Sequence, residues 1–264
     1  MSYLFTGGGG AGMELFKRAY PFAQFADAEP EASTNTLPLR RIPRATDPDF
    51  LQGIRSLLTQ PDMLVIPGVD KELPVLENLR REGVGILMPD QRYVTVMLDK
   101  FASMRWLAQL GVPVPRTVIV KPRQGRGSEG VLVEQERLEG TEYTVTMSAD
   151  CTGRLRAIVP VRIIAKRRVT IHGVTEAQQD VIAACHQIHA RCPAAGVVNI
   201  QGVLTEDRGF LPFEINPRIS TTTGLAVAAG VDVVANWIEE PHRLPLQPWL
   251  EGLELRRTWL NTVT

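Results

Sequence analysis

Apolar positions in the first hundred residues form short continuous runs that alternate with segments of helical spacing. Strands are predicted at "SYLFT", "FADAEP", "DMLVIPG" and "VGILMP". Helices are predicted at "GMELFKRAY", "DPDFLQGIRSLLTQ" and "KELPVLENLRREG". Because continuous apolar strands that alternate with helices are typical of parallel sheets covered on both faces, we expect an α/β unit over residues 1–98.

The pattern changes after residue 98. "DKFASMRWLAQLG" predicts a helix that Gly111 closes, and "TVIVKPRQGRGSEGVLVEQ" predicts a strand, a glycine-rich loop and a second strand. Antiparallel pairs are predicted from "TEYTVTMSAD" with "RLRAIVPVRIIAK" and from "GVVNIQGVL" with "FLPFEINPR". Helices follow at "TEAQQDVIAACHQIHARC", with Thr175 and Gln178 as a capping box, and within "GLAVAAGVDVVANWIE". An N-terminal α/β unit is therefore expected to be followed by a C-terminal α+β unit.

Composition excludes several classes of partner. Lys+Arg and Asp+Glu both number 29, so the formal net charge is zero and neither nucleic acid nor an anionic membrane is expected as the main partner. We find no apolar run of membrane-spanning length and no signal peptide, and we expect a cytoplasmic protein. The 3 cysteines lack metal-type spacing, and a disulfide framework is not expected.

A glycine run follows the first strand. Gly7, Gly9 and Gly12 match G-x-G-x-x-G, and Asp27 stands at the end of the next strand, as in a dinucleotide fingerprint. The run is so rich in glycine that several patterns would fit it. The alternative is a strand-to-helix turn whose backbone passes close to a ligand or a neighbouring helix.

A second glycine-rich stretch, "VIVKPRQGRGSEGV", follows another apolar strand. Lys121 ends that strand, and Gly125, Gly127 and Gly130 punctuate a loop that also contains Ser128. Glycines let backbone N–H groups converge on phosphate oxygens, and a lysine adds a positive charge. The lysine precedes the glycines, so this is not a Walker loop. We favour phosphate binding over a flexible hairpin tip.

Two further segments carry polar groups on strands. Glu136 and Glu142 flank an extended segment that could serve an adenine and a ribose, or could equally be a solvated edge. Glu214 and Asn216 are two residues apart on a strand and share a face, with Gln201 on the preceding strand. Oxygen ligands of these types suit Mg²⁺, or Mn²⁺ in its place.

Basic residues at two places in the sequence could bind anions. Arg218 follows the second of the polar strands and is placed to meet phosphoryl oxygens. Lys166, Arg167 and Arg168 could meet an anionic substrate, but a solvated strand end is the favoured interpretation.

The chain resembles the ATP-grasp superfamily, and within it the carbamoyl-phosphate-synthase-like branch of carboxylate ligases. The resemblance rests on "TGGGGAG", "IPGVDKELP", "MLDKFASMRWLAQLGVPVPRT", "KPRQGRGSEGV", "QERLEGTEYTV", "NIQG" and "FEINPR", which occur in the family's order. It implies a Rossmann-like pre-ATP-grasp domain at 1–98, a small lid subdomain at 99–150 and a large catalytic subdomain at 151–264.

The resemblance also implies roles for the residues above. Lys100 and Lys121 would contact ATP phosphates under a flap formed by Gly125, Gly127, Ser128 and Gly130. Glu136 and Leu138 would line the adenine hinge, with Glu142 on the ribose. Gln201, Glu214 and Asn216 would hold Mg²⁺. Arg218, Lys121 and Asn216 would act in the phosphoryl transfer itself.

The chain departs from the family in the lid. Only Arg116 and Thr117 separate "VPVP" from "VIVKP", and only "LVEQ" separates Val131 from Glu136, where relatives carry a longer strand and helix. Either the lid is minimal, or the sequence lacks lid residues that the natural chain carries. The joints fall where ATP-grasp lids move, which favours the second explanation.

Three functions are compatible with the sequence. The favoured one is an ATP-dependent ligase that activates a small carboxylate as an acyl phosphate for attack by an amine or another nucleophile. A regulatory or non-catalytic ATP-binding protein and a dehydrogenase-like binder that uses Gly7 to Gly12 are the alternatives. A homodimer is compatible with all three.

Overall fold

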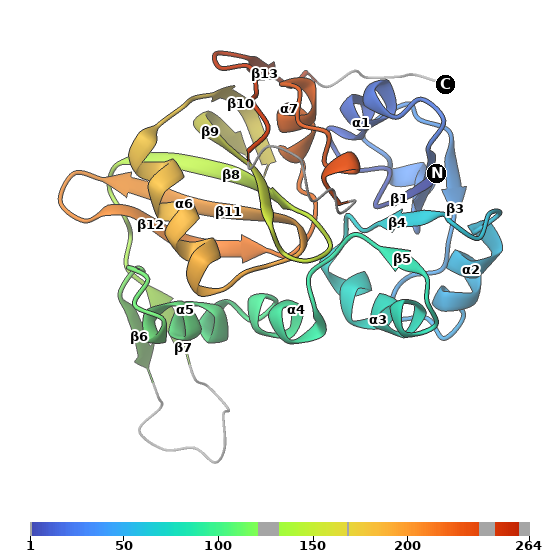
Figure 1. Ribbon diagram of the computed structural model, residues 1–264, viewed down its shortest axis with the longest axis horizontal. Helices are drawn as coiled ribbons and strands as arrows, with labels where there is room; N and C mark the ends of the chain where they lie inside the picture. Colours follow the sequence, from blue (N-terminus) through green and yellow to red (C-terminus); the bar gives the residue numbers. More distant parts are fainter. Residues whose placement is uncertain (1, 121–131, 168, 238–245, 259–264) are drawn as a thin grey trace.

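The computed structural model describes residues 2–120, 132–167, 169–237 and 246–258. The chain forms an N-terminal lobe built on a parallel sheet and a larger lobe built on an antiparallel sheet (Figure 1). None of the described helices is both long and apolar enough to cross a membrane. The predicted fold class, an α/β unit followed by an α+β unit, is confirmed.

The N-terminal lobe contains a five-stranded sheet of parallel strands in the order β3-β2-β1-β4-β5. The strands are β1 (Tyr3–Thr6), β2 (Gln24–Asp27), β3 (Leu39–Arg41), β4 (Leu64–Ile66) and β5 (Gly85–Ile86). The helical segments are α1 (Met13–Ala19), η1 (Pro30–Ala32), α2 (Phe50–Leu57), η2 (Asp70–Glu72) and α3 (Leu73–Arg81). This strand order is Rossmann-like.

Alternation along β1 explains how both faces of this sheet are covered. Leu4 packs with Phe50 and Ile54 of α2, in a core that also includes α3. The next residue, Phe5, faces the other way and packs with Phe16 of α1 and with Phe25, whose ring stacks on it at 5.2 Å between centroids.

The larger lobe contains a six-stranded sheet in the order β12-β11-β8-β9-β10-β13, with antiparallel neighbours. Its strands are β8 (Thr141–Ala149), β9 (Leu155–Arg167), β10 (Val169–Thr175), β11 (Gly196–Thr205), β12 (Gly209–Asn216) and β13 (Glu254–Arg256). Its helical segments are α6 (Gln179–Arg191), α7 (Thr223–Ala228) and η3 (Ala235–Trp237).

The two faces of the six-stranded sheet differ in polarity. On β8, Tyr143, Val145 and Met147 point into an apolar core shared with α6 and with α5 (Lys100–Gln109). Thr144 and Thr146 alternate with them and are also buried, on the opposite face. The sheet therefore carries a polar face that is turned toward the N-terminal lobe and α7.

The two lobes share a core. Phe5 and Phe16 of the first lobe belong to the same apolar cluster as Val159 and Val197 of the larger sheet and Val227 of α7. Because this cluster spans both lobes, we expect them to be held rigidly relative to one another.

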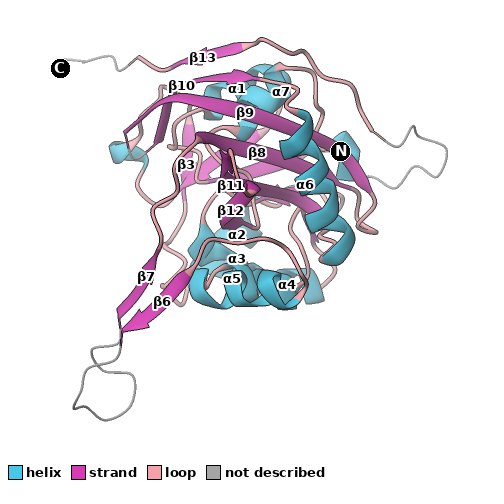
Figure 2. Cartoon of the chain, turned by 90° about the vertical axis from the view of Figure 1, so that its left-hand side faces the viewer, coloured by secondary structure: helices cyan, strands magenta, loops and turns pink. Residues whose placement is uncertain are grey.

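Along the chain, the two lobes are separated by α4 (Gln91–Met97), α5 and a separate antiparallel pair, β6 (Thr117–Val120) and β7 (Leu132–Gln135). β6 and β7 project from the body of the molecule beside α5 (Figures 1 and 2). β8 pairs with β9 and β11 in the larger sheet. The predicted boundaries at 98 and 150 stay a prediction, although pairing groups β8 with the strands that follow it.

The structure also contains elements that the sequence pattern did not predict, namely β3, α4, β10 and β13. The predicted capping box is wrong, because Thr175 ends β10 instead of capping a helix. Gln178 is the N-cap of α6, and its side chain accepts a hydrogen bond from the N–H of Asp180.

Candidate functional site

The polar face of the larger sheet borders a cavity of about 200 Å³, which we call the polar cavity. It lies where this face meets turn η2 of the N-terminal lobe and the loop that follows β12. Its lining residues are Asp70, Thr144, Lys166, Val169, Thr170, Asn199, Gln201, Glu214, Asn216, Arg218, Ser220, Thr221 and Thr222. Four residues predicted for the metal and phosphoryl chemistry, Gln201, Glu214, Asn216 and Arg218, are therefore brought together.

Strand register explains why the predicted metal ligands meet. On the β11–β12 ladder Gln201 lies opposite Glu214, and Asn199 lies opposite Asn216. The Gln201 Nε2 group donates to Glu214 Oε2 at 2.9 Å. The structure thus places the three predicted oxygen-bearing side chains on one patch of one sheet edge.

A β-bulge alters β12 next to Glu214. The register shifts between Gln201 and Gly202, so that Phe213 has no partner on β11. Phe213 borders a second cavity together with Lys100, and the Lys100 Nζ atom lies 2.9 Å from Glu214 Oε1. The bulge therefore directs consecutive side chains to two adjoining cavities.

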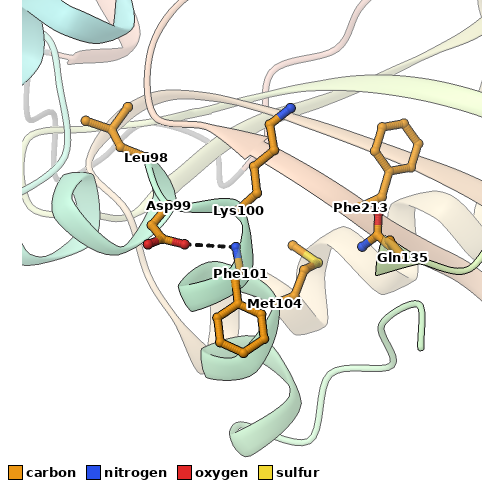
Figure 3. Close-up of a pocket in the computed structure, with 7 residues that line it drawn as sticks. All are labelled: Leu98, Asp99, Lys100, Phe101, Met104, Gln135 and Phe213. Carbon is orange, nitrogen blue, oxygen red and sulfur yellow. Dashed lines mark hydrogen bonds between the residues drawn. The ribbon is translucent and has the colours of Figure 1, made fainter. Parts of the chain in front are cut away.

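The second cavity, which we call the α5 cavity, has a volume of about 450 Å³ (Figure 3). Its lining residues are Leu98, Asp99, Lys100, Phe101, Met104, Gln135 and Phe213. Asp99 caps α5 by accepting hydrogen bonds from the N–H groups of Phe101 and Ala102, both at 2.9 Å. This cap fixes the start of the helix, where Lys100 extends toward β12 while Phe213 and Gln135 face it across the cavity (Figure 3).

Lys166 is exposed, as expected for a strand end, but it also contacts groups of the predicted site. Its Nζ atom donates to Glu142 Oε1 at 2.6 Å and to Gln201 Oε1 at 3.1 Å. It also lies 5.8 Å from the centre of the Phe213 ring. Glu142, predicted for the ribose, is therefore paired with a lysine of the polar cavity.

Arg218 is held by several acceptors. Its Nε and Nη2 groups donate to the two carboxylate oxygens of Asp70, each at 2.7 Å. Nη1 donates to Ile219 O at 2.9 Å, and Nη2 also reaches Asn216 Oδ1 at 3.3 Å. Sequence reasoning missed Asp70, because 148 residues separate it from Arg218.

The predicted hinge residues lie between β7 and β8. Glu136 accepts from the Arg116 N–H at 2.7 Å and from Arg208 Nη1 at 2.8 Å. The Arg208 hydrogen bond, followed by the Arg116 N–H, lowers the pKa of Glu136. Leu138 is half-buried and is not among the described residues that line either cavity. The structure therefore gives Glu136 an ionic role in bracing this junction.

The predicted phosphate loop lies in a part of the chain that the structure does not describe. Lys121, Gly125, Gly127, Ser128 and Gly130 lie outside the described residues. Their assignment to ATP phosphates stays a prediction.

A layer of hydroxyl and amide groups backs the polar cavity. Asn199 Nδ2 donates to Thr144 Oγ1 at 2.8 Å, and Thr144 Oγ1 lies 3.2 Å from Thr222 Oγ1. All three residues are buried. Alternation along β8 and β11 could have identified Thr144 and Asn199, because they occupy the face opposite the apolar core.

Backbone N–H groups of the N-terminal glycine run form hydrogen bonds within the N-terminal lobe. The N–H groups of Gly8, Gly9 and Gly10 donate to Ala26 O, to Asp27 Oδ2 and to a carbonyl within the run, at 2.9, 2.8 and 3.0 Å. The other Asp27 oxygen accepts from a backbone N–H two residues further on. Because these N–H groups and the Asp27 carboxylate are already hydrogen-bonded within the lobe, they are not free to bind a pyrophosphate and a ribose.

The end of the run instead allows the two lobes to approach closely. Gly12 has a φ of 92°, and a Cβ added there would lie 2.6 Å from Thr221 O. A Cβ added at Gly224 of α7 would lie 2.9 Å from Gly12 O. Of the two interpretations of this run, the structure favours the turn that packs against a neighbouring helix.

Glu72 is a buried carboxyl group beneath the run. It accepts a hydrogen bond from the Thr6 hydroxyl, which in turn accepts from the Gly68 N–H at 3.3 Å. Burial raises the pKa of Glu72 to about 7, Asp27 adds to the rise, and Thr6 and Arg218 oppose it. Glu72 is therefore protonated in the folded chain at a pH where it is ionised in the unfolded chain.

Replacing Glu72 by Gln should remove a pH dependence of stability. The folded state binds the extra proton between the ordinary pKa of 4.5 and about 7, so this carboxyl lowers the free energy of unfolding progressively across that window as pH rises. The full loss is about 3 kcal/mol. We would measure the free energy of unfolding by urea titration at pH 5 and pH 8. Relative to the wild type, Glu72→Gln should be more stable at pH 8 than at pH 5. Glu206→Gln, at an exposed turn, is the control; equal gains for both variants would contradict this account.

The donor set of the polar cavity fits one kind of metal. Among the described residues, no group of three or more His, Cys, Asp or Glu side chains is placed to hold a metal. Glu214 supplies one carboxylate, and Gln201 and Asn216 supply amide oxygens. Mg²⁺ is typically bound by one or two carboxylates plus substrate phosphates and water, so these residues suit Mg²⁺ that arrives with a nucleotide.

Comparisons with known proteins agree with this geometry. A family described as "ATP-grasp in the biosynthetic pathway with Ter operon" matches residues 128–253. No curated protein sequence matches the chain.

Several solved structures share the fold. An ATP-grasp superfamily protein from Archaeoglobus fulgidus is 17% identical, with a TM-score of 0.60 over 87% of this chain and 84% of that one. N5-carboxyaminoimidazole synthetase from Staphylococcus aureus, complexed with ADP, is 11% identical, with a TM-score of 0.62 over 86% and 73%. Rhizobium etli pyruvate carboxylase is 16% identical, with a TM-score of 0.60 over 89% of this chain but only 28% of that one. The chain therefore has the ATP-grasp fold, and residues 128–253 are similar to the ATP-grasp family described above.

Proposed function

We propose that the protein is an ATP-dependent ligase that activates a small carboxylate as an acyl phosphate. The observation that carries the proposal is the junction of the two cavities at Lys100 and Glu214, 2.9 Å apart. One cavity is largely apolar and large enough for a nucleoside, and the other is polar and contains the oxygen ligands and Arg218.

The nucleotide would span this junction. Its base and sugar would occupy the α5 cavity, between α5 and Phe213, and its phosphates would reach Lys100 and Lys166. The similar structures support a nucleotide ligand for this fold, since the synthetase from Staphylococcus aureus is a complex with ADP. The carbamoyl-phosphate-synthase-like branch and the predicted roles of Lys121 and its loop belong to the same proposal.

Charge placement in the polar cavity suits phosphoryl transfer. Mg²⁺ held by Glu214, Asn216 and Gln201 would neutralise phosphate oxygens when bound. Arg218, fixed beside them, is placed to meet the negative charge of the transferred phosphoryl group. The carboxylates of Glu214 and Glu142 hold the two lysines near the junction of the cavities, where a phosphate group would become a further anionic partner.

The polar cavity also limits the size and the polarity of the carboxylic acid that could bind. A volume of 200 Å³ corresponds to about six or seven water molecules. Its lining is rich in hydroxyl and amide groups, with Val169 as the single aliphatic residue among the described lining residues. We therefore infer a small polar carboxylic acid as the substrate class.

The test is a screen of amino acids and small hydroxy and dicarboxylic acids for ADP release from ATP and Mg²⁺. We expect ADP only when a suitable acid is present, and little ADP with aromatic or long aliphatic acids. ATP binding by calorimetry without ADP formation for any acid would contradict the ligase and favour a regulatory ATP-binding protein.

A further inference from the structure

The N-terminal lobe contributes one charged group to the polar cavity. Asp70 lies on η2, and its two carboxylate oxygens accept from Nε and Nη2 of Arg218, each at 2.7 Å. This bidentate geometry fixes the plane of a guanidinium as well as its position. The pair joins residues that belong to different lobes.

The remaining donors of Arg218 leave little freedom. A guanidinium has five N–H groups. Two hydrogen bonds go to Asp70, one goes to Ile219 O and one goes to Asn216 Oδ1 at the longer distance of 3.3 Å. Without Asp70, Nε would have no acceptor among these contacts, and the plane of the guanidinium would rest on the Ile219 carbonyl and on the longer Asn216 contact.

Asp70 itself stands on a fixed support. Glu72, two residues further along η2, is buried and bound to the Thr6 hydroxyl at the end of β1. Gly68, two residues before Asp70, approaches so closely that a Cβ there would lie 2.5 Å from Thr6 O. The turn that carries Asp70 is therefore clamped to the parallel sheet on both sides.

We propose that Asp70 is a positioning residue, which orients Arg218 toward the transferred phosphoryl group. The inference rests on the proposed ligase function and extends it, because it makes the N-terminal lobe part of the catalytic apparatus. Asp70 acts through Arg218 and needs no contact with substrate.

A purely structural role would have a different signature. The Asp70 side chain is 42% exposed and the Arg218 side chain 16%, and Asp70→Asn keeps a carbonyl oxygen that can accept from the guanidinium, so we expect little loss of stability. The lobes are also tied elsewhere: the Tyr20 hydroxyl donates to Asp232 Oδ1 at 2.7 Å, away from both cavities. Loss of Asp70 should therefore affect turnover much more than unfolding.

The experiment compares Asp70→Asn with Tyr20→Phe in the acid-dependent ADP assay and in thermal unfolding. For Asp70→Asn we expect kcat to fall about 10- to 100-fold, since a misplacement of about 1 Å can cost that much, with KM for ATP within about twofold and Tm little changed. Tyr20→Phe should lower Tm and leave kcat unchanged.

A double-mutant cycle shows whether Asp70 acts through Arg218. In an Arg218→Ala background, Asp70→Asn should have little further effect on kcat. Independent, multiplicative effects would overturn the inference, and so would a wild-type kcat for Asp70→Asn. If the wild-type protein forms no ADP with any acid while binding ATP, the proposed function fails, and this outcome is distinct from an active wild type whose turnover is indifferent to Asp70.

Discussion

Glu214→Gln should reduce acid-dependent ADP formation by about 100-fold or more at limiting Mg²⁺. Glu214 is the one carboxylate among the three predicted metal ligands, and its carboxamide counterpart carries no negative charge. The substitution preserves shape, and its carbonyl oxygen can still accept from Gln201 Nε2, which now lies at 2.9 Å. The lost ion pair with Lys100 is of little structural value, because the lysine side chain is 74% exposed. The fold should therefore survive.

Two measurements separate a metal role from a general one. Titration with a non-hydrolysable ATP analogue should show weakened binding for Glu214→Gln with Mg²⁺ present and nearly unchanged binding without it. Glu254→Gln is the matched control, because Glu254 lies on β13 at the opposite edge of the same sheet. Near wild-type turnover of Glu214→Gln at limiting Mg²⁺ would remove Glu214 from the metal site.

The larger elements of the fold could be predicted because their sequence signals are local. Continuous apolar runs identified β1 and β4, and alternation together with turn residues identified the β8–β9 and β11–β12 pairs. The missed elements lack such signals. β3 is three residues long and mostly exposed. α4 is rich in residues that favour strands, as in "YVTVM", and its clearest signal is Asp90, whose side chain caps the helix by accepting from the Tyr93 N–H.

The candidate site was predictable only where it is built along strands. Spacing placed Glu214 beside Asn216, and the neighbouring strand supplied Gln201. Asp70 could not be inferred, since its partner Arg218 lies in the other lobe and depends on how the lobes pack. Lys166 is exposed, as expected for a basic run at a strand end, but its contacts with Glu142 and Gln201 at the polar cavity could not be predicted, because they join three different strands.

The N-terminal glycine run matches a dinucleotide-binding pattern although its glycines serve close packing of the backbone. Its spacing matches a dinucleotide fingerprint, yet its amides bond within the lobe and Gly12 lies against Thr221. The same requirement, that backbones approach closely, selects glycine in both cases. Thr221 lines the polar cavity, so the glycine run packs against a residue of the candidate site.

Asp150→Ala should lower the free energy of unfolding by about 3–5 kcal/mol, a larger loss than we expect from breaking any exposed ion pair of the protein. Asp150 and Arg156 are both buried, and the carboxylate accepts from Arg156 Nε at 3.1 Å and Nη2 at 2.6 Å. The same carboxylate organises the β8–β9 turn through Thr152 and the Arg154 N–H. Its removal would leave a buried guanidinium without this carboxylate.

The pH dependence follows from the hydrogen bonds. Burial by itself would raise the pKa of Asp150, but the bonds from Thr152, Arg154 and Arg156 together lower it below its ordinary value of 3.8. A lowered pKa means that the stabilisation is complete above the unfolded-state value and is lost as pH falls through the folded-state value. Urea unfolding should therefore show the full deficit of Asp150→Ala at neutral pH and a smaller one in acid.

Two variants test this cause. Glu82→Ala breaks an exposed pair with Arg55, whose side chain is 39% exposed against 50% for Glu82, and should cost less than about 1 kcal/mol. Adding Arg156→Met to Asp150→Ala removes the buried charge and should recover part of the loss, because an apolar side chain of similar length is tolerated where a cation deprived of its carboxylate is not. A deficit for Asp150→Ala as small as that of Glu82→Ala would show that the buried pair contributes no more than an exposed one. A double variant no more stable than Asp150→Ala would trace the deficit to the broken turn instead of the buried guanidinium.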